Sequence, residues 1–451
     1  MATQAQPRKK ITGWIVFGMV LVVAFVCWRL AIDVNPVVNV PSPAVPKPNA
    51  RDFYLKARAD FVSSTIATAS GPYALDIAQV ETLLGRKAIG TGPGIAVLNT
   101  TGRAKDELIP SRGELQALMR LNAPALATLR KGFQYTYQDR PFRSFGAQTP
   151  QYTTYQSLAR CLSIDACAKR LGGDWNGAVN DGIDALRLGR DIPKGAPEMA
   201  MLAGISVQSI GRKDLWQTIE HLDGPQARAA LTRLEEIRSS HTACADVLQE
   251  EKWYNLAALS EAFRKPGWRS VLAKALELNT GNPFIGLEVA SISKRRIIND
   301  YTRYVDTQIA NMKLPYPAAP KAEPPLPDDS FAVALVPSSV KLQYTDANNE
   351  TQNNLLTVTV ALRAFAAERG HYPAALTELV PAYLKALPAD LFAQNGTILY
   401  KQTGKTYVLY SVGPDGKDDG GTPVMDGKTP KAFWSVAETD AGDIVAGVNA
   451  Q

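Results

Sequence analysis

The pattern of apolar and polar positions divides the chain into an N-terminal apolar run, a helical middle and a C-terminal part with short strands. In the middle, apolar residues recur three to four positions apart, as between Ala178 and Leu186, which is the period of a helix face. Helix boundaries are marked by Gly172-Gly173-Asp174 and by Asp223-Gly224-Pro225, since glycine ends helices and aspartate or proline begins them. This pattern predicts a mostly α-helical domain over residues 51–314.

The last hundred or so residues change character. Apolar residues occupy one face of a helix predicted over Thr351–Arg369, and a second short helix is predicted over Leu376–Leu384. Two runs rich in β-branched and aromatic residues follow, Thr397–Tyr400 and Thr406–Ser411, and Gln402–Lys405 between them is a hairpin signal. Helix followed by a small antiparallel sheet is an α+β pattern.

Two proline-rich segments separate these units. Five prolines between Asp33 and Ala50 predict an extended stalk over residues 33–50. Six more between Pro315 and Pro327 predict a linker over residues 315–340. The chain is therefore predicted to be α+β, with an N-terminal transmembrane helix, a mostly α-helical central domain, and a small C-terminal domain over residues 341–451 that combines a long helix with an antiparallel sheet.

The N-terminal apolar run is long enough to cross a bilayer. Residues Ile11–Trp28 carry no charge, and ten of the eighteen are Ile, Leu, Val or Phe, which favours insertion. Three basic residues end the segment 1–10, so the positive-inside rule predicts a cytoplasmic N-terminus, an anchor over residues 11–32 and a body outside the cytoplasm. A cleaved signal peptide is the alternative, but no small-x-small site follows the run. A lipoprotein at Cys27 is a further alternative, although Val26 is a poor match before it.

Composition limits the remaining possibilities. The formal charge of +6 comes from 49 basic and 43 acidic residues, and no aromatic-studded basic run concentrates it, so nucleic-acid binding is not expected. Cys27 falls within the apolar run, which leaves Cys161, Cys167 and Cys244. Three buried thiols are expected rather than a disulfide framework, with a bridge from Cys244 as the alternative.

Catalytic motifs are not found. Gly404-Lys405-Thr406 has Leu399 where a phosphate-binding loop begins with glycine, so it is interpreted as a hairpin turn. The histidines, His221, His241 and His371, are far apart, and none is interpreted as part of a metal-ligand pair at helical spacing, which gives little support to zinc or to histidine-based nucleophilic catalysis. No catalytic residue and no enzymatic activity are predicted.

Several C-terminal segments together resemble a known family. Gly370-His371-Tyr372-Pro373, Leu387-Pro388-Ala389-Asp390 and Tyr407–Gly416 occur in order, and this run is similar to the soluble domain of the major pseudopilin of type II secretion. The family's glutamate early in the hydrophobic helix corresponds here to Gly18, and the similar region is far from the apolar run. Pilus-type polymerisation is therefore not expected. Residues Ala166–Leu188 also resemble part of a tetratricopeptide helix pair, without a second copy at a fixed period.

The pseudopilin resemblance implies a calcium site in the loop after the second strand. The corresponding residues are Asp415, Asp418 and Asp419, with Asp443 downstream. Carboxylates and inward-turned carbonyls of a glycine-rich loop are ligands that calcium prefers. A solvated Asp-Gly turn is the alternative interpretation of the same residues.

These observations favour a membrane-anchored bacterial envelope protein with a binding or scaffolding role, carrying a calcium-stabilised pseudopilin-like module. Its expected partners are the inner membrane, through one span, and envelope or secretion-system proteins. One alternative is an accessory component of a type II secretion or pilus-like system. Another is an envelope hydrolase whose site in the helical domain carries no recognised motif.

Overall fold

The computed structural model describes residues 17–24, 33–61, 65–68, 71–74, 112–141, 143 and 152–449. Most of this chain is helical, in α2 Ala50–Asp60, α4 Arg112–Gly132, α5 Tyr152–Leu171, α6 Trp175–Asp191, α7 Glu198–Trp216, α8 Gly224–Ser239, α9 Cys244–Phe263, α10 Trp268–Ala275, α11 Pro283–Ser291, α12 Lys294–Met312, α13 Ser330–Val333 and α14 Ser339–Arg369. Short 3₁₀ helices are η2 Ile219–His221, η3 Tyr316–Ala318, η4 Leu376–Leu379 and η5 Phe433–Ser435. The strands are β1 Thr65–Thr68, β2 Gly71–Ala74, β3 Leu399–Thr403, β4 Thr406–Ser411, β5 Met425–Asp426, β6 Thr429–Pro430 and β7 Ile444–Val445.

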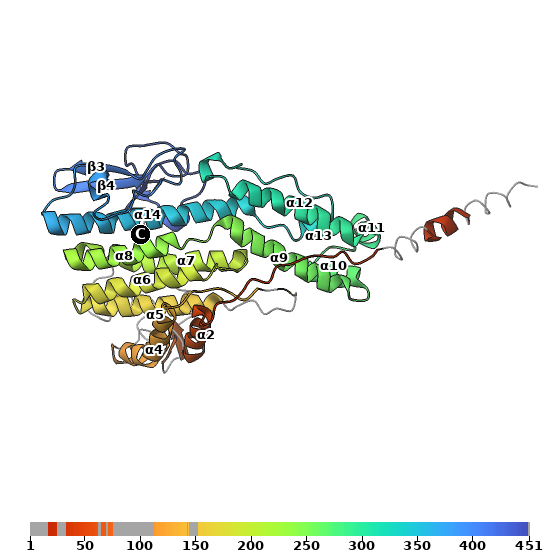
Figure 1. The fold of residues 1–451 in the computed structure, drawn as a ribbon, viewed down its shortest axis with the longest axis horizontal. Helices are drawn as coiled ribbons and strands as arrows, with labels where there is room; N and C mark the ends of the chain where they lie inside the picture. Colours follow the sequence, from red (N-terminus) through yellow and green to blue (C-terminus); the bar gives the residue numbers. More distant parts are fainter. Residues whose placement is uncertain are drawn as a thin grey trace, which may run out of the picture.

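The helices stack in layers beneath a small sheet (Figure 1). The stack runs from α2 and α4 through α5, α6, α7 and α8 to α14, and the antiparallel sheet β3-β4-β7 covers the far side of α14. Helices α9 and α12 pack together and continue the body toward α10 and α11. The predicted α+β class, with helices and a small C-terminal antiparallel sheet, is confirmed.

Local capping residues begin two central helices where the sequence predicts it. The side chain of Asp174 accepts a hydrogen bond of 2.8 Å from the Gly177 amide at the start of α6. Asp223 forms a reciprocal capping box with Gln226 at the start of α8. Each cap satisfies an amide that the first helical turn leaves without an intrahelical partner.

Glycine lets α6 and α7 approach closely. Gly182 and Gly189 on α6 are seven residues apart, as are Gly204 and Gly211 on α7. A Cβ added at Gly189 would be 2.5 Å from the Gly204 carbonyl oxygen, and one at Gly211 would be 2.5 Å from that of Gly182. The two antiparallel helices therefore make backbone contact at two points two turns apart.

The C-terminal unit begins with a longer helix than the sequence predicts. Helix α14 starts at Ser339, twelve residues before Thr351, and ends at Gly370, whose φ of 77° is the left-handed conformation that closes helices. The sequence pattern does not reveal this first part of α14, because residues just before Thr351 are polar. Several of them, such as Asn348, Asn349 and Glu350, are nevertheless buried. The second predicted helix is only the 3₁₀ turn η4, since Pro381 lacks the amide that would continue it. The predicted hairpin is confirmed as β3 and β4.

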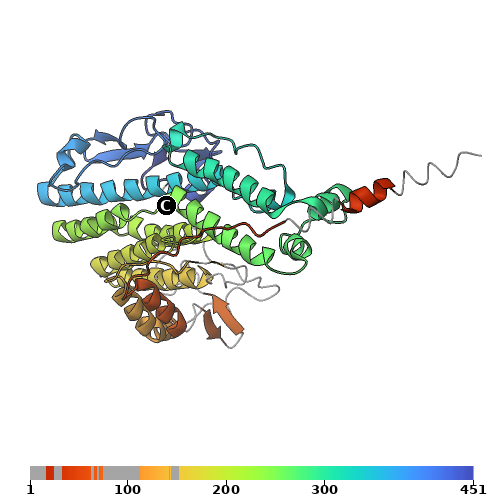
Figure 2. The same cartoon turned by 45° about the vertical axis from the view of Figure 1, so that its right-hand side comes forward.

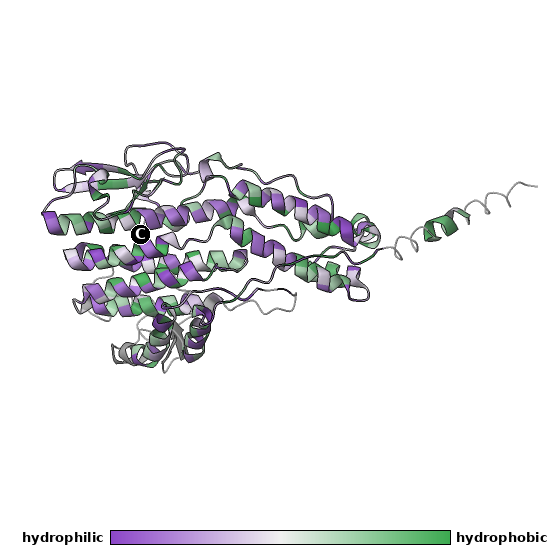
Figure 3. Ribbon diagram, in the orientation of Figure 1, coloured by the Kyte–Doolittle hydropathy of each residue, from purple (hydrophilic) through white to green (hydrophobic). Residues whose placement is uncertain are grey.

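The predicted transmembrane anchor, residues 11–32, falls mostly outside the described residues. Its residues 17–24 are helical, with apolar side chains exposed, and extend beyond the α10–α11 end of the body (Figures 1 and 3). Among the helices that the structure describes, none is both long and apolar enough to cross a membrane.

The predicted stalk follows the body from one end to α2 (Figures 1 and 2). Val38 and Val40 pack against the core formed by α9 to α13, and Asn49 caps α2 through a 3.0 Å hydrogen bond from the Arg51 amide. The segment is extended, as its prolines predict, and it is also attached along its length.

One hydrophobic core contains residues from both sides of the predicted linker. Ile183 on α6 and Leu231 on α8 belong to the same cluster as Leu355 on α14 and Leu409 on β4. Helix α14 is accordingly buried on nearly every side between Asn348 and Leu362. The division of the chain into domains stays a prediction, but the helical layers and the sheet share this core.

The three cysteines among the described residues are buried and form no disulfide bond. The expectation of buried thiols for Cys161, Cys167 and Cys244 is confirmed, and the alternative bridge from Cys244 is not formed.

Candidate functional site

The aspartates predicted to bind calcium lie in and beside the loop between β4 and β5. Asp443 is fully buried, and its carboxylate accepts hydrogen bonds from the amides of Asp419, at 3.2 Å, and Gly421, at 2.6 Å. Asp418 accepts from the Tyr410 hydroxyl at 3.1 Å. The Asp443 side chain therefore shapes the loop from inside, while Asp418 and Asp419 stay exposed.

Negatively charged carboxylates lie close together in this loop. Burial raises the pKa of Asp443, the amide hydrogen bonds lower it, and the charges of Asp418 and Asp419 raise it further, so that the pKa is above its ordinary value. Asp415 accepts a hydrogen bond from the Lys417 amide at 3.2 Å. The structure thus gathers three of the four predicted ligands, Asp418, Asp419 and Asp443. Among the residues that the structure describes, these aspartates do not form a set of ligand atoms within 4.8 Å of one another.

A different group of side chains does bring its ligand atoms within 4.8 Å of one another. The ligand atoms of His241, Asp346 and Glu350 all lie within 4.8 Å of one another. His241 Nε2 is 3.0 Å from Asp346 Oδ1, and the Cys244 thiol donates to Asp346 Oδ2 at 3.3 Å. His241 and Cys244 come from the turn into α9, whereas Asp346 and Glu350, four residues apart, share one face of α14. We call these four residues the His-Cys-Asp-Glu cluster.

The cluster shifts the pKa values of its own members. Burial lowers the pKa of His241, but its hydrogen bond to Asp346 and the nearby carboxylates outweigh burial, so the pKa is raised. Burial and the charge of Asp346 raise the pKa of the Cys244 thiol well above its ordinary value. The thiol is therefore not an activated nucleophile, which would need a lowered pKa.

A buried polar network continues from the cluster into the protein. Arg190 on α6 holds Glu350 through two hydrogen bonds of 2.8 and 2.9 Å. Asn349 and Asn353 both donate to Glu350 Oε1 at 3.0 Å. Both asparagines also accept from Arg212 on α7, at 2.8 and 2.7 Å. Burial lowers the pKa of Arg212 to about 9, against the charge of Glu350, which raises it.

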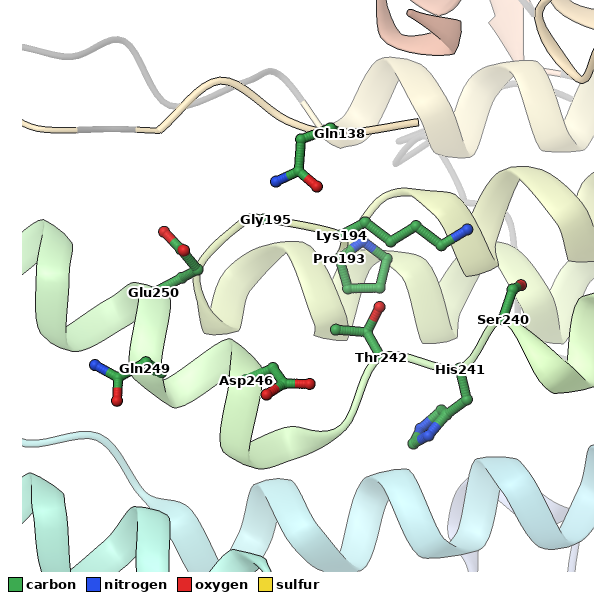
Figure 4. A pocket seen from close by; sticks show the side chains of 10 residues that line it. All are labelled: Gln138, Pro193, Lys194, Gly195, Ser240, His241, Thr242, Asp246, Gln249 and Glu250. Atoms are coloured by element: carbon green, nitrogen blue, oxygen red, sulfur yellow. The ribbon is translucent and has the colours of Figure 1, made fainter. Parts of the chain in front are cut away.

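An open, polar cavity of about 450 Å³ adjoins the cluster (Figure 4). It is lined by the turn after α6, the turn between α8 and α9, the first turns of α9, and Gln138. Two of its charged side chains are paired: Lys194 contacts Asp191 at 2.6 Å, and Glu250 contacts Arg143 at 3.0 Å. In Figure 4 the ring of His241 points from the cavity wall toward α14.

An apolar surface occurs at the end of the body from which residues 17–24 extend. Phe284 and Leu287, three residues apart on α11, are 84% and 71% exposed, and Val271 on α10 is 42% exposed. We call these three residues the apolar tip. The chain segments on either side of it carry five exposed basic residues, Arg264, Lys265, Lys274, Arg295 and Arg296, and one exposed acidic residue, Glu277.

The start of the stalk is fastened beside the apolar tip. Asp33 accepts hydrogen bonds from Arg269 at 3.1 Å and from the Lys294 amide at 3.0 Å. The buried Lys294 ammonium also donates to the Asp33 carbonyl and to Asn35. The chain therefore leaves the body at a defined position next to α11.

The histidines and the cluster show what the sequence search missed. His221 stacks on Trp175 with ring centroids 3.7 Å apart, and His371 is exposed, so both have the roles expected of isolated histidines. His241 differs because its partners are not histidines. The spacings His241-x-x-Cys244 and Asp346-x-x-x-Glu350 were available signals, but nothing local connects segments a hundred residues apart.

The fold and these sites define an α+β protein in which the long helix α14 carries many of the buried polar side chains. Comparison with known proteins adds no relative: no family model, curated protein or solved structure matches the chain.

Proposed function

We propose that this chain is a membrane-anchored bacterial envelope protein with a binding or scaffolding role rather than a catalytic one. The proposal rests on the apolar tip, which lies close to Asp33 at the start of the stalk. Residues 11–28, the predicted membrane span, precede Asp33 in the chain. An exposed pair of large apolar side chains, in a part of the chain with more exposed basic than acidic residues, is suited to the boundary between lipid headgroups and acyl chains.

Chain length supports this arrangement. Asp33, held by Arg269 and Lys294, follows Trp28 by five residues, which can span at most about 18 Å. If residues 11–28 cross the bilayer, the tip must therefore be close to its surface. The basic residues around the tip then face the headgroups, while the β3–β4 hairpin at the opposite end of the body points away (Figure 1).

The test uses the full chain, in a Cys27→Ser background, reconstituted into vesicles that contain anionic lipid. An environment-sensitive fluorophore is attached at Leu287→Cys or, as the matched control, at the exposed hairpin residue Lys405→Cys. We expect nitroxide-labelled lipids to quench the fluorophore at position 287 strongly and the one at position 405 weakly. Equal quenching at both positions would contradict a membrane-facing tip.

A separate measurement tests the anchor itself. Membranes from cells that express the full chain are washed with alkaline carbonate, which removes peripheral proteins. The chain should stay in the pellet and dissolve only in detergent. Recovery of the full-length chain in the soluble fraction would overturn the proposed function whatever the result at the tip.

The proposal includes calcium at the loop of Asp415, Asp418 and Asp419, beside Asp443. Supporting it are the like charges of Asp418 and Asp419 near Asp443, which a divalent cation would neutralise. Calcium added to metal-free protein should raise the melting temperature, because a ligand that binds only the native state stabilises it. The increase should be lost in Asp418→Asn and kept in Asp426→Asn, which changes an exposed aspartate outside the set. An unchanged melting temperature in the wild type would remove calcium from the proposal.

A second candidate is an accessory component of a type II secretion or pilus-like system. The order of a long helix, α14, followed by the sheet β3-β4-β7 supports it. Polymerisation into a filament is not part of this candidate, because α14 is covered by α7, α8 and the sheet. Co-purification with a secretin or an assembly platform would favour it over an independent envelope protein.

A further inference from the structure

We propose that the His-Cys-Asp-Glu cluster is a structural binding site for a divalent transition metal ion, with zinc as the fitting ion. The site joins the turn before α9 to the middle of α14. It does not depend on the membrane or calcium proposals, since none of its residues belongs to the tip or to the aspartate loop.

The residue types and their chain spacing suit zinc. Cysteine sulfur, histidine nitrogen and carboxylate oxygen are its usual protein ligands, and four of them close a structural site. His241 and Cys244 are three residues apart at the start of α9, and Asp346 and Glu350 are one helical turn apart on α14. Asp346 and Glu350 thus lie on one face of α14, and the connection before α9 brings His241 and Cys244 to the same Asp346 carboxylate.

The distances suit a tetrahedral site. Bond lengths of about 2.0–2.3 Å to zinc place neighbouring ligand atoms about 3.3–3.6 Å apart. His241 Nε2 and Cys244 Sγ are 3.0 and 3.3 Å from the two oxygens of Asp346. His241, Asp346 and Glu350 each offer a ligand atom, and these three atoms all lie within 4.8 Å of one another. Side-chain movements of about 1 Å would bring these atoms and the Cys244 sulfur to bonding positions.

The surroundings hold the fourth ligand in place. Metal-binding carboxylates are themselves hydrogen-bonded, which fixes their orientation, and Glu350 is held by Arg190, Asn349 and Asn353. The charges are also complementary. The Cys244 thiolate, Asp346 and Glu350 would carry three negative charges, opposite the zinc ion and the guanidinium groups of Arg190 and Arg212.

A simpler interpretation of the cluster involves no metal. The His241–Asp346 pair and the Cys244 hydrogen bond could by themselves stabilise the turn. The two interpretations differ in a measurable way, because only the metal site makes both spectroscopy and stability respond to an added ion.

The experiment uses the full chain purified in detergent and freed of metal with a chelator. Cobalt(II) is added as a spectroscopic substitute for zinc, and zinc is then added to displace it. We expect one equivalent of cobalt to produce visible ligand-field bands and a near-ultraviolet thiolate-to-cobalt band, and zinc to raise the melting temperature. Cys244→Ser should remove the near-ultraviolet band, and His241→Asn should weaken binding at least tenfold.

Two further variants keep the test decisive. Asp346→Asn should weaken binding as His241→Asn does, which covers the case in which one variant fails to fold. His371→Asn removes an exposed histidine outside the cluster and should bind like the wild type. If the wild type shows neither cobalt bands nor a zinc-dependent melting temperature, or if Cys244→Ser and His241→Asn bind as it does, the proposal is wrong.

Discussion

Replacing Arg190 with methionine should lower the free energy of unfolding by about 3–5 kcal/mol, the largest single-residue effect that we expect in this protein. Arg190 is almost completely buried and donates two hydrogen bonds to Glu350. Burial raises the pKa of Glu350, and the charge of Arg190 brings it below its ordinary value. Without the guanidinium, the buried carboxylate would lose two hydrogen bonds and the strongest of the opposing charges that act on it.

The loss should be measured by chemical denaturation with a chelator present, so that metal binding does not contribute. A second substitution, Glu350→Gln, removes the remaining charge while its amide oxygen still accepts from Asn353. The double variant Arg190→Met/Glu350→Gln should therefore regain a large part of the loss. Lys265→Met breaks an exposed pair with Glu261, which is 3.2 Å away, and should change stability by less than about 1 kcal/mol. Equal losses for Arg190→Met and Lys265→Met would show that the buried pair has no special role.

Gly189→Ala should destabilise the protein by about 1–3 kcal/mol, although alanine is intrinsically the better helix former. The added Cβ would be 2.5 Å from the Gly204 carbonyl oxygen and 2.8 Å from the Gln208 amide nitrogen. Both atoms belong to the backbone of α7 and cannot rotate away. The helices must separate, and the apolar contacts on both sides of the crossing are then weakened.

The direction of the stability change distinguishes a close helix crossing from an ordinary helical position. At a helical position with free space, the same substitution stabilises by about 0.5–1 kcal/mol. Asn176→Ala changes an exposed residue in the first turn of α6 and should stay within about 0.5 kcal/mol of the wild type. A thermal or chemical denaturation curve in which Gly189→Ala is more stable than the wild type would contradict the close crossing of α6 and α7.

The candidate sites could be predicted from the sequence only in part. The aspartate loop was found because its residues are nearly contiguous and follow a recognisable strand, and the structure gathers Asp418 and Asp419 near Asp443. The His-Cys-Asp-Glu cluster was not found, because each half has only two potential ligands. Two polar residues at a suitable spacing are common in any helix. They become a candidate site only when the fold brings α14 against the turn before α9.

The apolar tip could not be predicted from the sequence either. Phe284 and Leu287 have the spacing of an ordinary core-facing helix pair, and their sequence carries no sign of exposure. Only the packing of α11, whose one buried residue is Val289, shows that they face outward.

The sequence by itself determined the features that a few neighbouring residues control. Asp174 and Asp223 cap their helices, Gly370 ends α14, and the turn at Gly404 joins two strands, because these outcomes depend on local hydrogen bonds and on backbone conformations that glycine favours. Tertiary structure decided which helices meet. Two examples are the glycine contacts between α6 and α7 and the buried Arg190–Glu350 pair. Both stabilise the protein only after segments that are distant in the chain have packed together and excluded water, and no local sequence pattern specifies which segments will meet.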